Sequence, residues 1–209
     1  MIRPRPATLI AVFGLGAAVP ALGATNLTAD MTNAQENPPA IPTTTTGQPR
    51  PASFGTAIFV LSDDQTQMTM VATVNNIDFT GTQTPDTNDN LTAAHIHASP
   101  TGTATTNAGV VWGFFGAPFN DIAPNDQVVT PFASGVGGTI NAKWDAAEGQ
   151  STTLTAQIPN ILSQHAYVNF HTTQFGGGEV RGFLVVPEPS AVTACLALSG
   201  LALRRSRRV

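Results

Sequence analysis

Hydrophobic and polar residues alternate along the middle of the chain, which is the pattern of β-strands whose two faces meet different surroundings. The clearest example is residues 52–62 and 67–79, two alternating or β-branched segments joined by the polar turn Asp63-Asp64-Gln65, which are predicted to form a hairpin. Gly176-Gly177-Gly178 is predicted to be the turn of the last hairpin. Strands are predicted at residues 52–62, 67–79, 92–98, 110–115, 138–144, 152–158, 166–172 and 179–186.

Helical periodicity is weak by comparison. One helical turn is expected at most, over residues 161–164, because Pro159 argues against anything longer. The predicted fold is therefore all-β, an antiparallel Greek-key-like sandwich or partly closed barrel of about eight or nine strands. A segment rich in proline and threonine, residues 33–51, is expected to project from this domain as a low-complexity loop.

The N-terminal segment, residues 1–24, has the parts of a secretory signal peptide. Arg3 and Arg5 give it a positive start, residues 7–19 form an apolar stretch shorter than a comfortable membrane span, and Ala21-Leu22-Gly23 supplies small residues for cleavage. A retained N-terminal anchor is the alternative. The folded domain is then expected over residues 25–186.

The C-terminal segment, residues 187–209, joins Pro187-Glu188-Pro189 to an apolar run, 191–203, and a cluster of four arginines. As a helix the apolar run would span about 20 Å, short of a bilayer core near 30 Å, so we expect transient membrane contact. The order of these parts resembles the PEP-CTERM sorting signal of Gram-negative bacteria. That resemblance implies cleavage near Pro187, Glu188 and Pro189 by an exosortase-type protease, and delivery to the cell surface or the exopolysaccharide matrix.

Charge is distributed unevenly between the ends and the domain. Between residues 24 and 186 only Arg50, Lys143 and Arg181 oppose twelve acidic residues, a net charge of −9. Such a domain is a poor partner for a nucleic-acid backbone or an anionic membrane surface, and nucleic-acid binding is excluded. The single cysteine, Cys195, lies in the C-terminal segment, so the domain has no disulfide.

Candidate chemistry centres on histidine. His95 and His97 share one face of a predicted strand about 6.6 Å apart, and His171 ends another strand, so the three could converge on one metal ion. Glu179 could accept a hydrogen bond from the His171 ring across the last hairpin. The polar residues expected around these histidines are Tyr167, Asn169, Glu179 and Arg181.

Two interpretations of this cluster stay open. Imidazole groups suit zinc, copper or nickel, which favours a single-metal site or redox enzyme built on His95, His97 and His171. Alternatively, the same side chains form a hydrogen-bonded patch that holds strands together. A complete two-metal site of the copper/zinc superoxide dismutase kind is excluded, because the chain has only four histidines and lacks the structural disulfide.

Three ordered motifs resemble the CHRD (chordin) domain. Residues 92–97 are similar to its central signature, 167–172 with 178–182 to its C-terminal signature, and 34–39 to its opening. The resemblance spans about residues 27–185 and implies an extracellular module. The export signals, the acidic domain and the absence of a recognisable nucleophile or pair of catalytic acids favour a non-enzymatic binding or structural role. The place expected for it is the cell surface or the matrix, with extracellular polysaccharide or surface proteins as partners. The metalloprotein, holding copper or zinc, is the alternative.

Overall fold

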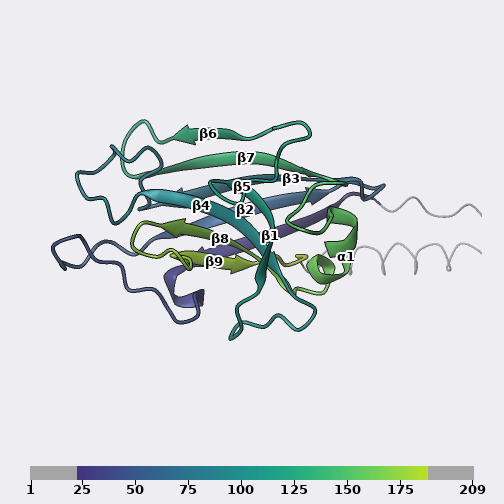
Figure 1. Cartoon of the computed structure of the whole chain (residues 1–209), viewed down its shortest axis with the longest axis horizontal. Coiled ribbons are helices and arrows are strands. Elements are labelled where there is room, and N and C mark those ends of the chain that lie inside the picture. The colour runs from purple at the N-terminus through teal and green to yellow at the C-terminus, as the bar shows by residue number, and fades with distance from the viewer. Residues whose placement is uncertain (1–22, 188–209) are drawn as a thin grey trace, which may run out of the picture.

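The computed structural model describes residues 23–187, and nine strands in this part of the chain pair into one antiparallel sheet (Figure 1). The strand order is β5-β4-β8-β9-β1-β2-β3-β7-β6. The predicted secretory signal and the predicted sorting segment fall almost wholly on residues 1–22 and 188–209, outside the described residues. Within residues 23–187 no helix is long and apolar enough to cross a membrane.

The predicted all-β fold is confirmed, in its partly closed form, because a single sheet curls into a half-barrel. Seven of the eight predicted segments contain a strand. The elements are β1 (Thr25–Thr32), the 3-10 helix η1 (Asn33–Gln35), β2 (Phe54–Leu61), β3 (Gln67–Asn75), β4 (Leu91–Ala98), β5 (Gly109–Phe115), β6 (Val128–Pro131), β7 (Gly137–Asp145), α1 (Leu154–Leu162), β8 (Ala166–Thr172) and β9 (Val180–Phe183).

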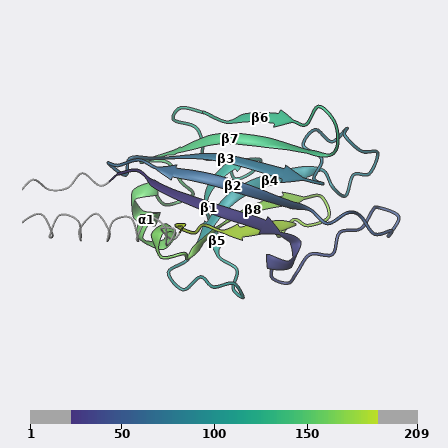
Figure 2. The same cartoon turned by 180° about the vertical axis from the view of Figure 1, so that it is seen from behind.

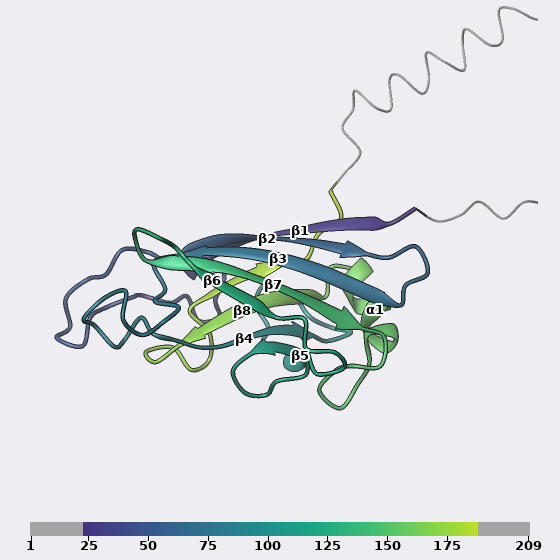
Figure 3. The ribbon, with the colours of Figure 1, turned by 90° about the horizontal axis from the view of Figure 1, so that it is seen from above.

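The curl of the sheet places β4 and β5 opposite β3 and β7, as the view from above shows (Figure 3). Alternate residues of β2 and β3 point into the enclosed core, which explains the period-two pattern of their sequences. Trp112 of β5 and Trp144 of β7 are both fully buried, and their rings stack with centroids 5.4 Å apart and an interplanar angle of 2°. This pair joins two strands that are far apart in the sheet order.

The prediction of a strand at residues 152–158 is wrong, because most of this segment forms the first part of helix α1. Thr153 caps the helix, its hydroxyl accepting a hydrogen bond from the Ala156 amide at 3.2 Å. Leu154, Ile158 and Ile161 recur at helical spacing and are buried, so α1 covers one end of the half-barrel (Figures 1 and 2). Pro159 lies inside the helix, which the prediction of a single turn over residues 161–164 did not allow.

Two strands and one loop also differ from expectation. β1 and β6 were not among the predicted strands, although β1 pairs with β2 along its whole length. The 33–51 segment, expected to project, packs against the domain at both ends. Glu36, Ala40 and Pro42 are buried, and the tip, residues 45–49, is exposed throughout.

The outer edges of the sheet are β5 and β6. On β5, the carbonyl groups of Val111 and Gly113 accept hydrogen bonds from the amides of Gln150 and Asn120, each at 2.8 Å. The other edge strand, β6, has four residues and ends at Pro131, which has no backbone N–H to donate. Both edges are therefore poor places for another strand to add.

Candidate metal centre

His95, His97 and His171 come together because β4 and β8 are neighbours in the sheet. His171 lies opposite Ala93, one alternate position from His95, so the antiparallel pairing places all three imidazoles on one face. Ile96, between the two histidines of β4, points the other way into the hydrophobic core. The candidate ligand atoms of the three histidines all lie within 4.8 Å of one another. The structure thus brings His95, His97 and His171 together, which the sequence could only suggest.

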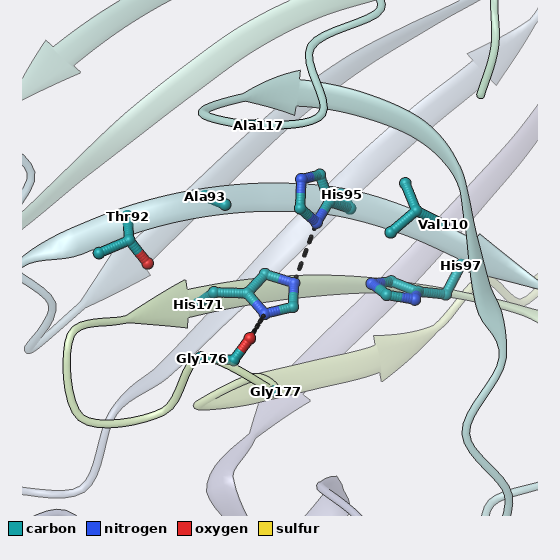
Figure 4. A pocket seen from close by; sticks show the side chains of 9 residues that line it. All are labelled: Thr92, Ala93, His95, His97, Val110, Ala117, His171, Gly176 and Gly177. Atoms are coloured by element: carbon teal, nitrogen blue, oxygen red, sulfur yellow. Dashed lines mark hydrogen bonds between the residues drawn. The ribbon is translucent and has the colours of Figure 1, made fainter.

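Backbone hydrogen bonds fix the protonated nitrogen of two rings. The Nδ1 of His97 lies 2.9 Å from the Ala108 carbonyl oxygen. The Nδ1 of His171 lies 3.0 Å from the Gly176 carbonyl oxygen, as Figure 4 shows. A carbonyl oxygen only accepts, so each Nδ1 carries the hydrogen and donates it. The Nε2 atoms of His97 and His171 therefore carry lone pairs, as metal ligands must.

The third ring faces one of these lone pairs. The Nδ1 of His95 is 3.1 Å from the Nε2 of His171, shown as a dashed line in Figure 4. Two lone pairs at this distance repel, so either a hydrogen on His95 or a cation must lie between them. In addition, the Nε2 atom of His97 is enclosed and has no hydrogen-bond partner among the described residues. Buried polar atoms without partners are uncommon and call for an explanation, such as a bound ion.

Burial keeps the three rings neutral. The exposed fractions of His95, His97 and His171 are 4, 7 and 6 %. Loss of solvent lowers the pKa of His95 to about 3, assisted by the neighbouring His171 and His97, and lowers the pKa of His97 to about 4. Burial also lowers the pKa of His171. Near neutral pH all three imidazoles are in the unprotonated state that binds a metal ion.

A cavity of about 450 Å³ opens beside the histidine rings (Figure 4). Its other walls come from β4, β5, the loop after β5 and the β8–β9 turn. All of them are small side chains or glycines, and none is charged: Thr92, Ala93, Val110, Ala117, Gly176 and Gly177. The histidines are therefore buried, with an uncharged cavity beside them.

Tyr167 supports His97 from the side. The two rings stack with centroids 4.9 Å apart and an interplanar angle of 2°. The Tyr167 hydroxyl accepts a hydrogen bond from the Ala108 amide at 3.1 Å, while the Ala108 carbonyl accepts the bond from His97. The Arg181 guanidinium lies 4.8 Å from the centre of the Tyr167 ring. Tyr167 therefore orients His97 both directly and through Ala108.

Glu179 does not hold His171, contrary to the expectation from the sequence. The N–H of His171 goes to the Gly176 carbonyl, and the carboxylate of Glu179, which is fully buried, pairs with Arg50 at 2.7 Å. Glu179 also accepts hydrogen bonds from the hydroxyls of Ser53 and Thr172. This separate buried network ties the 33–51 segment to β8 and β9.

Arg181 and Asn169 also have structural partners. Arg181 is fully buried and donates to the carbonyls of Gln35, Ala104 and Thr106 and to the side chain of Asn107. The amide nitrogen of Asn169 is 3.5 Å from the Gly177 carbonyl, on the hairpin turn beside the cavity. Sequence reasoning missed the backbone carbonyls of Ala108 and Gly176, which orient two of the histidines. Only the glycine run at 176–178 gave a signal, and it indicated a turn.

A second buried carboxyl group, Glu36, lines a neighbouring cavity of about 380 Å³ that shares Gly176 and Gly177 with the first. Burial raises its pKa from 4.5 to about 7, although the charge of Arg181 opposes the shift. Between about pH 4.5 and 7, Glu36 is therefore protonated in the folded protein and ionised in the unfolded chain. The stability that this proton provides is complete below this window and is lost as pH rises through it.

Replacing Glu36 with glutamine removes this pH dependence. Between pH 5 and pH 8 the variant is expected to gain about 2 kcal/mol of unfolding free energy relative to the wild type. Urea unfolding of both proteins at several pH values measures the difference. If the unfolding free energies of the two proteins changed in parallel with pH, the pKa of Glu36 would not be raised by folding.

A family model described as CHRD domain matches residues 27–184 of the chain. The matched region contains all three histidines, the backbone groups that orient them and the walls of the adjoining cavity. No curated protein and no solved structure matches the chain.

Proposed function

Since the chain belongs to the CHRD domain family, we propose that it is an exported module that binds one copper or zinc ion through His95, His97 and His171. CHRD domains are typically extracellular and are in general not enzymes, which agrees with a binding role. The observation that carries the proposal is the convergence of three buried, neutral imidazoles whose candidate ligand atoms lie within 4.8 Å of one another.

The geometry needs a side-chain adjustment to hold an ion. Histidine nitrogens bind zinc at about 2.0–2.1 Å, so two ligands of one tetrahedral ion are about 3.4 Å apart. Closing the cluster from 4.8 Å to that separation requires about 1.4 Å of movement, shared among the side chains. Neutral imidazole is a good ligand for both copper and zinc, and the negative charge of the domain attracts cations in general.

The two ends of the chain support export and display. In the proposal, residues 1–24 direct secretion, and an exosortase-type protease acts at Pro187-Glu188-Pro189. The domain then resides at the cell surface or in the exopolysaccharide matrix of a Gram-negative bacterium. Terminal sequencing of the protein recovered from cell fractions tests the processing. Pull-down against matrix polysaccharide and surface proteins tests the partners.

Metal content decides the central claim. Protein purified without chelators, and apoprotein titrated with Cu²⁺ or Zn²⁺, are expected to bind one ion per chain. Replacing His97 with alanine is expected to weaken binding by about 100-fold or more, since a ligand is lost. His165, which takes no part in the cluster, provides the matched control, and its alanine variant should bind as the wild type does.

Two results would contradict metal binding. One is a wild-type protein that folds normally and takes up no ion. The other is a His97→Ala variant with unchanged affinity. Either result would favour the hydrogen-bonded patch that holds β4 to β8. Dismutase and hydrolase assays of the loaded protein test whether the ion also supports catalysis.

A further inference from the structure

Three histidines leave a bound ion with an unfilled coordination position. Among residues 23–187, the only group of three or more histidine, cysteine, aspartate or glutamate side chains placed to bind one ion is His95, His97 and His171. Zinc and related ions take four ligands, and a site with three protein ligands keeps one position for a water molecule or another small molecule. The cavity beside the rings gives such a molecule access, because small side chains and glycines form its other walls.

The charges around the site favour an anion in that position. The three ligands are neutral, so they do not compensate the charge of a divalent ion. No carboxylate lines the cavity, and the buried carboxylate of Glu179 is already paired with Arg50. Arg181, next to Tyr167, adds further positive charge behind His97. A positive charge buried without compensation is costly, and an incoming anion removes that cost.

On the basis of the proposed metal centre, we infer that the cavity admits a small exogenous anion, of the size of azide or a monocarboxylate, to the open coordination position of the ion. The cavity of about 450 Å³ lies within the range of about 300–1,000 Å³ for small-molecule sites. The ligand is held by its bond to the metal, beside the apolar side chains of Val110, Ala93 and Ala117.

Gly177 offers a way to close the cavity without disturbing the histidines. A Cβ atom added there meets nothing within 4 Å, and the backbone is outside the left-handed region. Leucine at this position should occupy part of the cavity, whereas alanine adds a single methyl group. The adjacent Gly178 is unsuitable, because its φ is +126° and an added Cβ would overlap the Asn169 side chain.

Azide titration of the copper(II)-loaded protein tests the inference. We expect a saturable azide-to-copper charge-transfer band at one azide per copper. The Gly177→Leu variant should bind copper at the same stoichiometry and bind azide about tenfold more weakly or worse. Gly177→Ala should remain within about threefold of the wild type. The band should be missing from His97→Ala, which controls for copper bound elsewhere.

The outcomes separate this inference from the proposed function. If the wild type binds one copper and gives no azide band, or if Gly177→Leu binds azide as tightly as the wild type, the anion site is wrong and the metal centre stands. If the wild type binds no copper, the metal centre itself is wrong and the anion site fails with it.

Discussion

Replacing Glu179 with alanine is expected to lower the free energy of unfolding by about 3–5 kcal/mol. The variant leaves the Arg50 guanidinium in the protein interior without a counter-charge, because the wild-type ion pair is buried on both sides. It also removes the acceptor of the Ser53 and Thr172 hydroxyl hydrogen bonds. Urea unfolding followed by circular dichroism measures the loss.

A double-mutant cycle separates the ion pair from the loss of packing. Arg50→Ala, Glu179→Ala and the double variant are compared with the wild type. Removing both charges leaves neither one uncompensated, so the double variant should be at least about 2 kcal/mol more stable than the sum of the single losses predicts. Additive losses would show that Arg50 and Glu179 act independently.

Replacing Trp112 with alanine is expected to cost a similar amount, about 3–5 kcal/mol, because it empties a large part of the enclosed core. Trp112 is fully buried and stacks on Trp144, and it also contacts Phe114 with ring centroids 5.3 Å apart. It lies on the edge strand β5, which has strand pairing on one side only. The stack is therefore a major contact between β5 and the opposite wall of the half-barrel.

Phe54 provides the aromatic control for this experiment. It lies on β2, and its side chain is 51 % exposed on the outer face of the sheet. The Phe54→Ala variant should change the unfolding free energy by about 0.5 kcal/mol or less. If the losses from Trp112→Ala and Phe54→Ala were equal, the stacked tryptophans would not stabilise the closure of the sheet.

The local sequence pattern was enough to predict most of the strands and the shared face of His95 and His97, but not the position of His171. The period of two along residues 92–98 places His95 and His97 on one face whatever the strand pairs with. The position of His171 depends on β4 and β8 being neighbours, a pairing across more than seventy residues that no local pattern encodes. From the sequence, convergence of the three histidines was therefore only a hypothesis, based on their positions in predicted strands.

The remaining errors come from contacts that are remote in sequence. Glu179 was expected to serve His171 because the two are close along the hairpin, whereas its partner Arg50 is 129 residues away. Residues 152–158 have threonines and an isoleucine suited to a strand, yet the capping threonine and the burial of Leu154, Ile158 and Ile161 favour a helix. In both cases tertiary contacts outweighed the local preference.

The protected edges of the sheet have a consequence at high local protein concentration. β5 has backbone hydrogen bonds from neighbouring loops on its outer side, and β6 is short and ends in proline. Within residues 23–187, neither edge presents a long row of free amide and carbonyl groups to a second molecule. Close crowding of these domains therefore gives them little opportunity to polymerise into amyloid-like fibres.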